Sequence, residues 1–204
     1  MFIGTEQTRF SIVSLAPLIS LTSVRGIVIV SGNERLPNLE GLNNLVTIQG
    51  EGRSGSATDK SIFEGSSLNN IDALSSLKTV NKGLIISGFN NNINSIDGLS
   101  SLETVGRLDI RRTNMTNLDP LMNLNSVNKL VISQNNLLTN IDGLSNINSP
   151  IGTISFGGND LLNDFCGIRH VFLEYGLIDE NYYLVSGNAY NPSQQGIIDG
   201  NCSL

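Results

Sequence analysis

An apolar phrase that recurs about every two dozen residues limits what this chain can fold into more than any other feature. The phrase is [I/L/M]-x-x-[I/L]-[D/E]-x-L-x-x-[L/V/I]-x-x-[V/I]-x-x-L-x-I, and its copies begin at positions 12, 36, 68, 93, 115, 138 and 162. A repeat of this length is one supersecondary unit that cannot bury its apolar face alone, so successive units must stack. The sequence therefore predicts a solenoid.

Short alternating segments within the repeats predict parallel strands. They lie at 27–29, 84–86, 108–110, 130–132 and 154–156, and in each we expect the outer two residues to point inward and the middle one outward. Elsewhere apolar residues recur at every third position among Gly, Pro, Ser and Asn, which favours 3₁₀-like corners over long helices. The expected fold class is mainly β (α/β in the leucine-rich repeat classification), a right-handed parallel β-solenoid.

Composition changes divide the chain into three parts. Residues 1–11 form a lead-in at the open end of the stack, residues 12–162 form the solenoid, and residues 163–204 form a capping unit. The second repeat is longer than the others because residues 50–60 are a Gly- and Ser-rich insertion, which predicts a surface loop. In the cap we expect a helix over 165–175, stopped by Gly176, and a strand over 182–185.

Polar residues repeat in register with the apolar ones. We expect an asparagine ladder to satisfy backbone groups where the chain bends, a hydroxyl ladder to bond the corner backbone, and an acidic ladder to cap turns. The asparagines are Asn33, Asn114, Asn136 and Asn159; the hydroxyl residues are Ser23, Thr47, Thr79, Thr104 and Ser126; the acids are Glu40, Asp72, Asp97, Asp119 and Asp142.

Charge argues against nucleic acid as a partner, and hydropathy argues against a transmembrane segment. The net charge is −6 and the pI is about 4.7, with Lys and Arg scattered along the sequence, whereas nucleic acid requires a basic face. No apolar run approaches the roughly 20 residues of a transmembrane helix, so we expect no transmembrane segment. Residues 1–4 do not resemble a secretory signal, and we infer that a natural export signal has been removed.

Two cysteines, Cys166 and Cys202, lie in the capping unit. Their even number, the few lysines and the Asn-rich composition favour an exported protein with one disulfide. Two unrelated reduced thiols are the alternative.

The residues that carry chemistry are sparse. His170 is the only histidine, so no histidine-based metal cluster can form, and we expect it at a surface or interface. No phosphate-binding glycine loop or nucleophile elbow occurs. Successive carboxylates of the acidic ladder would lie about 4.8 Å apart, close enough for hydrolysis or cation binding. A regular ladder gives each acid the same surroundings, however, which argues against an acid and base pair. We expect no catalytic residue, metal or cofactor.

The outward strand positions are the candidate ligand-binding surface. The candidates are Val28, Ile85, Arg107, Asp109, Arg111, Lys129 and Val131. Val28, Ile85 and Val131 are expected to form an apolar patch in adjacent repeats, which often marks an interaction surface. Two alternatives remain open: the 50–60 insertion folds over the patch, and the arginines with Asp109 form a self-neutralising network.

The segments 80–86 (VNKGLII) and 99–106 (LSSLETVG), followed by LDI at 108–110, resemble the receptor L domain, a leucine-rich β-solenoid of extracellular receptors and bacterial surface proteins. Segment 93–102 (INSIDGLSSL) is similar to the internalin-type bacterial repeat. The segments 164–166, 187–192 and 200–202 are similar to the cap of repeat proteins secreted or lipid-anchored by Gram-negative bacteria, which implies a Cys166–Cys202 bridge.

The resemblance implies a non-enzymatic binding or adhesion module at a cell surface, outside the cell or in the periplasm. Its partner would be a protein or glycan, and a lipid anchor outside this sequence would be compatible with it. The competing hypotheses are a carbohydrate-active solenoid that uses the acidic ladder and a structural spacer of a larger surface protein.

Overall fold

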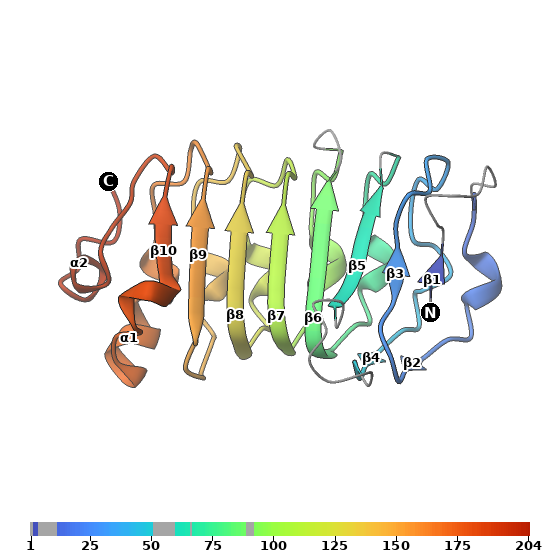
Figure 1. Cartoon of the computed structure of the whole chain (residues 1–204), viewed down its shortest axis with the longest axis horizontal. Helices are drawn as coiled ribbons and strands as arrows, with labels where there is room; N and C mark the ends of the chain where they lie inside the picture. Colours follow the sequence, from blue (N-terminus) through green and yellow to red (C-terminus); the bar gives the residue numbers. More distant parts are fainter. Residues whose placement is uncertain (1, 4–11, 51–59, 66, 89–91) are drawn as a thin grey trace.

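The chain folds as a parallel β-solenoid of about five turns. The computed structural model describes residues 2–3, 12–50, 60–65, 67–88 and 92–204. The turns lie side by side along the long axis of the molecule, and the small C-terminal helices close one end (Figure 1). The predicted fold class is therefore confirmed: mainly β, with only a small helical part near the C-terminus.

Ten described strands form one sheet, and every pair is parallel. The main row has the order β1-β3-β5-β6-β7-β8-β9-β10, while β2 pairs with β4 and β4 with the start of β6. The strands are β1 (Phe2–Ile3), β2 (Ser23–Val24), β3 (Ile29–Val30), β4 (Thr47–Ile48), β5 (Lys60–Gly65), β6 (Thr79–Gly88), β7 (Thr104–Arg111), β8 (Ser126–Ser133), β9 (Thr153–Gly157) and β10 (Tyr183–Ser186). The hydroxyl ladder is in register, because its members occupy matching positions at the starts of β2, β4, β6, β7 and β8.

Strand β5 corrects the sequence analysis, which predicted a loop over residues 50–60 and no strand after it. Residues 51–59 lie outside the described part, but Lys60 already begins a six-residue strand between β3 and β6. Its inward positions are Ser61 and Phe63, which are 1% and 0% exposed. Ser61 accepts a hydrogen bond from the Val28 backbone N–H through Oγ at 3.1 Å. A polar residue at an inward position hid the alternation that marks a strand.

Short 3₁₀ turns form the side of the solenoid behind the sheet (Figure 1). They match the three-residue spacing of the apolar positions, since a 3₁₀ helix has three residues per turn. They are η1 (Ala16–Leu18), η2 (Asp72–Leu74), η4 (Asp97–Leu99), η5 (Asp119–Leu121), η6 (Asp142–Leu144), η7 (Cys166–Ile168) and, in the cap, η8 (Glu180–Tyr182). Stacking is close: a Cβ on Gly98 would lie 1.9 Å from the Ile71 carbonyl oxygen of the preceding turn, so only glycine fits there.

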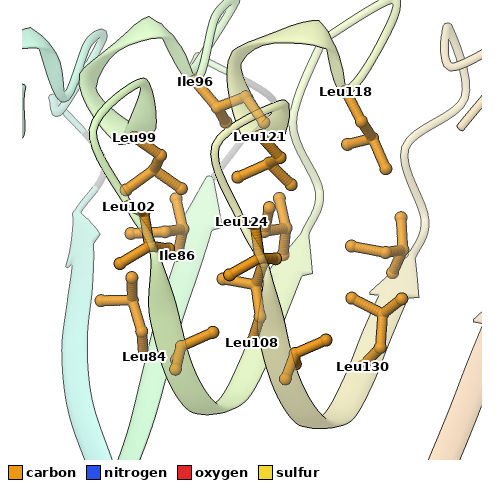
Figure 2. Close-up of a cluster of buried hydrophobic side chains, with 14 of the residues drawn as sticks. Leu84, Ile86, Ile96, Leu99, Leu102, Leu108, Leu118, Leu121, Leu124 and Leu130 are labelled. Atoms are coloured by element: carbon orange, nitrogen blue, oxygen red, sulfur yellow. The ribbon is translucent and has the colours of Figure 1, made fainter. Parts of the chain in front are cut away.

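The core fills the space between the sheet and the 3₁₀ side. Figure 2 shows Ile96, Leu99 and Leu102 on one wall facing Leu84 and Ile86 of β6 on the other. All five are at most 1% exposed. The repeated apolar positions therefore build one continuous column, as a stack of otherwise unstable units requires.

The asparagine ladder exists but differs from the prediction by one residue at two levels. Asn135 is fully buried and Asn136 exposed, and buried Thr113 occupies the level expected for Asn114. Asn135 donates to the Ile110 carbonyl (3.1 Å) and accepts from Thr113 N–H (3.0 Å) and Oγ1 (2.8 Å). Asn159, which was predicted correctly, accepts from Asn135 N–H at 3.0 Å.

The C-terminal cap is tied to the last solenoid turn. It contains α1 (Arg169–Tyr175), which ends at Gly176 (φ 82°), then β10 and α2 (Gln194–Ile198). Cys166 and Cys202 form a disulfide with a Cα–Cα distance of 4.9 Å, as predicted. Burial raises the pKa of Tyr183, whose hydroxyl donates to the Pro192 carbonyl at 2.7 Å.

Candidate binding surface

The outward residues of the sheet lie in rows that run across the strands. One row contains Ile62, Ile85, Asp109, Val131 and Ser155 from β5 to β9, as the strand register requires. The next row contains Lys60, Gly83, Arg107, Lys129 and Thr153. Six of the seven predicted candidates therefore lie on the outer face of the sheet.

Val28 is the exception and corrects the prediction. Val28 is 0% exposed. Val30, two residues further on and therefore on the same face, pairs with Phe63 of β5, which in turn pairs with the inward Ile86 of β6. The segment 27–30 is apolar at every position, so alternation could not reveal which residues face inward. Ile29 takes the outward place and pairs with Ile62 of β5.

The predicted apolar patch is interrupted at Asp109, which lies between Ile85 and Val131 in their row. On the other side of Ile85 the row stays apolar, because Ile62 of β5 lies between Ile85 and Ile29. The alternative that the 50–60 insertion folds over the patch concerns mainly residues 51–59, which lie outside the described part of the chain.

Asp109 is a fully buried carboxylate on the outer face, at 0% exposure. Arg107 Nη2 donates to its Oδ2 at 2.5 Å, and Arg111 donates to both carboxylate oxygens. Two cations thus share one anion, and the trio keeps a net positive charge. The Arg107 side chain is 22% exposed, and among the described residues its buried Nε has no hydrogen-bond partner.

A groove of about 480 Å³ opens beside this trio. Four cations line it, namely Lys60, Lys82, Arg107 and Lys129, and we call it the basic groove. Asn81 and Asn128 add amide groups, and none of the described residues that line the groove is acidic or aromatic. The volume lies within the roughly 300–1,000 Å³ typical of ligand pockets.

Two glycines and a bulge shape the floor of the basic groove. Val80 pairs with Val105 and Gly83 with Arg107, so β6 has one residue more than β7 between these positions. A Cβ on Gly106 would lie 2.7 Å from the Asn81 and Lys82 carbonyl oxygens, so the bulge excludes a side chain there. Bulges often redirect side chains at functional sites.

The cations affect one another. Partial burial, followed by the positive charge of Arg107, lowers the pKa of Lys60; Arg111 and Lys129 act in the same direction and Asp109 opposes them. The sequence analysis missed the groove because Lys60 and Lys82 lie where the insertion and the bulge break the repeat pattern. The sequence offered one signal for the groove: Arg107 and Lys129 occupy matching outward positions in successive repeats.

The acidic ladder lies in the 3₁₀ turns, away from the sheet. Asp72, Asp97, Asp119 and Asp142 are each the first residue of a turn and are exposed. The predicted capping role of these acids is wrong. Across the described ranges, the backbone N–H of each acid donates to the side chain of the residue two positions earlier. For example, Asn117 Oδ1 accepts from Asp119 N–H at 3.0 Å and Ser95 Oγ from Asp97 N–H at 2.9 Å.

Neighbouring acidic side chains affect one carboxylate of the ladder, Asp142. Partial burial, then the negative charges of Asp164 and Asp119, raise the pKa of Asp142.

In the part of the chain that is described, no group of three or more His, Cys, Asp or Glu side chains could hold a metal ion. His170 is half-buried, with Nε2 2.6 Å from the Ile147 carbonyl oxygen.

The fold and this surface define a disulfide-capped parallel β-solenoid with a basic groove on the outer face of its sheet. None of the described helices is long and apolar enough to cross a bilayer. Comparisons of the chain with protein-family models, curated proteins and solved structures found no match.

Proposed function

We propose that this chain is a non-enzymatic binding module of a secreted or cell-surface protein, related to the leucine-rich receptor L domains. It binds a protein or glycan through the outer face of the sheet. The observation that carries the proposal is the basic groove, a shallow and open site with charged and amide groups on the outer face of the sheet. The Cys166–Cys202 bridge supports an oxidising compartment such as the cell exterior.

The acidic ladder supports binding over catalysis. Hydrolysis by paired carboxylates needs two groups with unlike surroundings, so that one is protonated while the other is ionised. Asp97 and Asp119 are both exposed and begin equivalent turns. Nothing in their environments separates an acid from a base.

The experiment tests which face captures a ligand. A glycan array and a pull-down from bacterial and host surface extracts would compare the natural chain with Ile85→Trp, which adds bulk at the centre of the outer face. Met122→Trp is the matched control, because Met122 is 49% exposed on the 3₁₀ side. We expect Ile85→Trp to weaken capture roughly tenfold, as loss of complementarity at an interface centre does, and Met122→Trp to leave it unchanged.

Three results would overturn the proposal. Capture that is insensitive to Ile85→Trp would exclude the outer face, and absence of any captured ligand would favour the structural spacer. Polysaccharide cleavage that disappears in a variant with Asp97→Asn and Asp119→Asn would establish the enzyme instead.

A further inference from the structure

The cations of this acidic chain are concentrated on one face. Of its 12 Lys and Arg residues, five lie on the outer face between β5 and β8, although the chain carries a net charge of −6. They are Lys60, Lys82, Arg107, Arg111 and Lys129. A positive concavity on a negative molecule focuses its field on anionic ligands.

The carboxylates on the same face do not cancel this charge. Among the described strand residues they are Asp109, which is buried between two arginines, and Glu64, which accepts from the Ser31 hydroxyl at 2.7 Å. Neither lines the basic groove. Within the described ranges, Lys60, Lys82 and Lys129 form no ion pair, whereas Lys78 pairs with Glu103 at 3.0 Å.

The arrangement of the cations indicates a ligand with repeated charges. Lys60, Arg107 and Lys129 lie in one row on β5, β7 and β8. Strands are about 4.8 Å apart, so this row spans about 14 Å from the first backbone to the last. One carboxylate cannot contact cations at both ends, whereas an extended chain with an acidic group on successive units can.

The other groups of the basic groove suit sugar hydroxyls. Asn81 and Asn128 each offer both donors and an acceptor, which a hydroxyl can match. Single-stranded nucleic acid binding relies on aromatic side chains for base stacking, and the part of the groove lining that the structure describes contains none. An acidic polysaccharide therefore fits better than a nucleic acid.

We propose that the basic groove binds an acidic polysaccharide, whose carboxylate or sulfate groups pair with Lys60, Arg107 and Lys129 while its hydroxyls bond the two asparagines. This inference rests on the binding role proposed above and names the ligand class for the same surface.

The test is affinity electrophoresis and titration with four probes: polygalacturonate for carboxylate, dextran sulfate for sulfate, neutral dextran, and single-stranded DNA. The groove variant carries Lys60→Gln, Lys82→Gln and Lys129→Gln. The matched control carries Arg25→Gln, Arg35→Gln and Lys78→Gln, which are exposed residues outside the groove lining. Both variants lose three positive charges, so they separate the groove from net charge, and thermal unfolding checks that both are folded.

We expect at least one acidic probe to bind and neutral dextran not to bind. The dissociation constant should rise roughly tenfold or more in the groove variant and stay within about twofold in the control. Binding should also weaken as sodium chloride is raised, because the screening length falls to about 3 Å at 1 M salt.

Equal losses in both triple variants would overturn the inference, as would undiminished binding by the groove variant. Tighter binding of single-stranded DNA than of either acidic polysaccharide would point to nucleic acid instead. If no acidic probe binds, the inference fails. The proposed function stands in that case if the Ile85→Trp experiment still finds a ligand that depends on the outer face.

Discussion

Asn135 illustrates how one side chain can hold neighbouring turns of the solenoid together. Its amide bonds backbone groups of Thr113 and Ile110 in the preceding turn, and its own backbone N–H donates to Asn159 in the next one. These backbone groups lie where the strands end and cannot pair within the sheet. Buried polar groups require such partners, because each unsatisfied group costs about 1–3 kcal/mol.

We predict that Asn135→Ala lowers the free energy of unfolding by about 2–4 kcal/mol, since it leaves at least two buried backbone groups without a partner. Asn136→Ala is the matched control, because the neighbouring side chain is exposed; it should change stability by less than about 0.5 kcal/mol. Urea unfolding followed by circular dichroism measures both values. Equal effects of the two substitutions would contradict the buried ladder.

Strands β3 and β5 show how neighbouring elements determine an orientation that periodicity leaves open. The run Ile27-Val28-Ile29-Val30 has two equivalent faces by hydropathy. Pairing with β5 fixes its orientation: Val30 aligns with buried Phe63, and Val28 lies against Ser61. A shift of one residue would turn every side chain of a strand to the other face.

We predict that Val28→Asp unfolds the N-terminal turns, because an unpaired carboxylate in the core costs several kcal/mol. Ile29→Asp should be much milder, since Ile29 is only half-buried and its carboxylate would reach water. Thermal unfolding of the two variants gives the comparison. A lower melting temperature for Ile29→Asp than for Val28→Asp would restore the orientation expected from sequence.

At the scale of the whole molecule, charge is distributed asymmetrically, and the C-terminal end of the solenoid is closed. The acidic ladder lies on the 3₁₀ side and the basic groove on the opposite, outer face of the sheet, which leaves that face as the site for an anion. The C-terminal end is closed by the cap, where Phe165 N–H donates to the Cys202 carbonyl at 2.8 Å beside the disulfide. The bridge thus fixes the tail to the last turn.

We predict that replacing both cysteines by alanine lowers the free energy of unfolding by about 3–4 kcal/mol, since the bridge closes a loop of 36 residues. Denaturant titration with and without reductant tests this, because reductant should destabilise the natural chain and leave the alanine variant unchanged. Thiol titration of the denatured, unreduced protein should find no free thiol. Two reactive thiols would refute the bridge.

The sequence by itself determined the solenoid and most of its buried column, and it favoured the disulfide. The solenoid and the column depend on apolar spacing that recurs within each repeat, so Leu99 and Leu102 could be assigned to the core without knowing their neighbours. Only the tertiary structure decided the orientation of β3, the choice of Asn135 over Asn136, and the basic groove. Asn135 and Asn136 are identical residues, and residues 27–30 are all apolar. In neither case could an alternation of apolar and polar residues show which side chain faces inward. The groove joins residues as distant in sequence as Lys60 and Lys129, which become neighbours only through strand register, after an insertion and a bulge have broken the repeat.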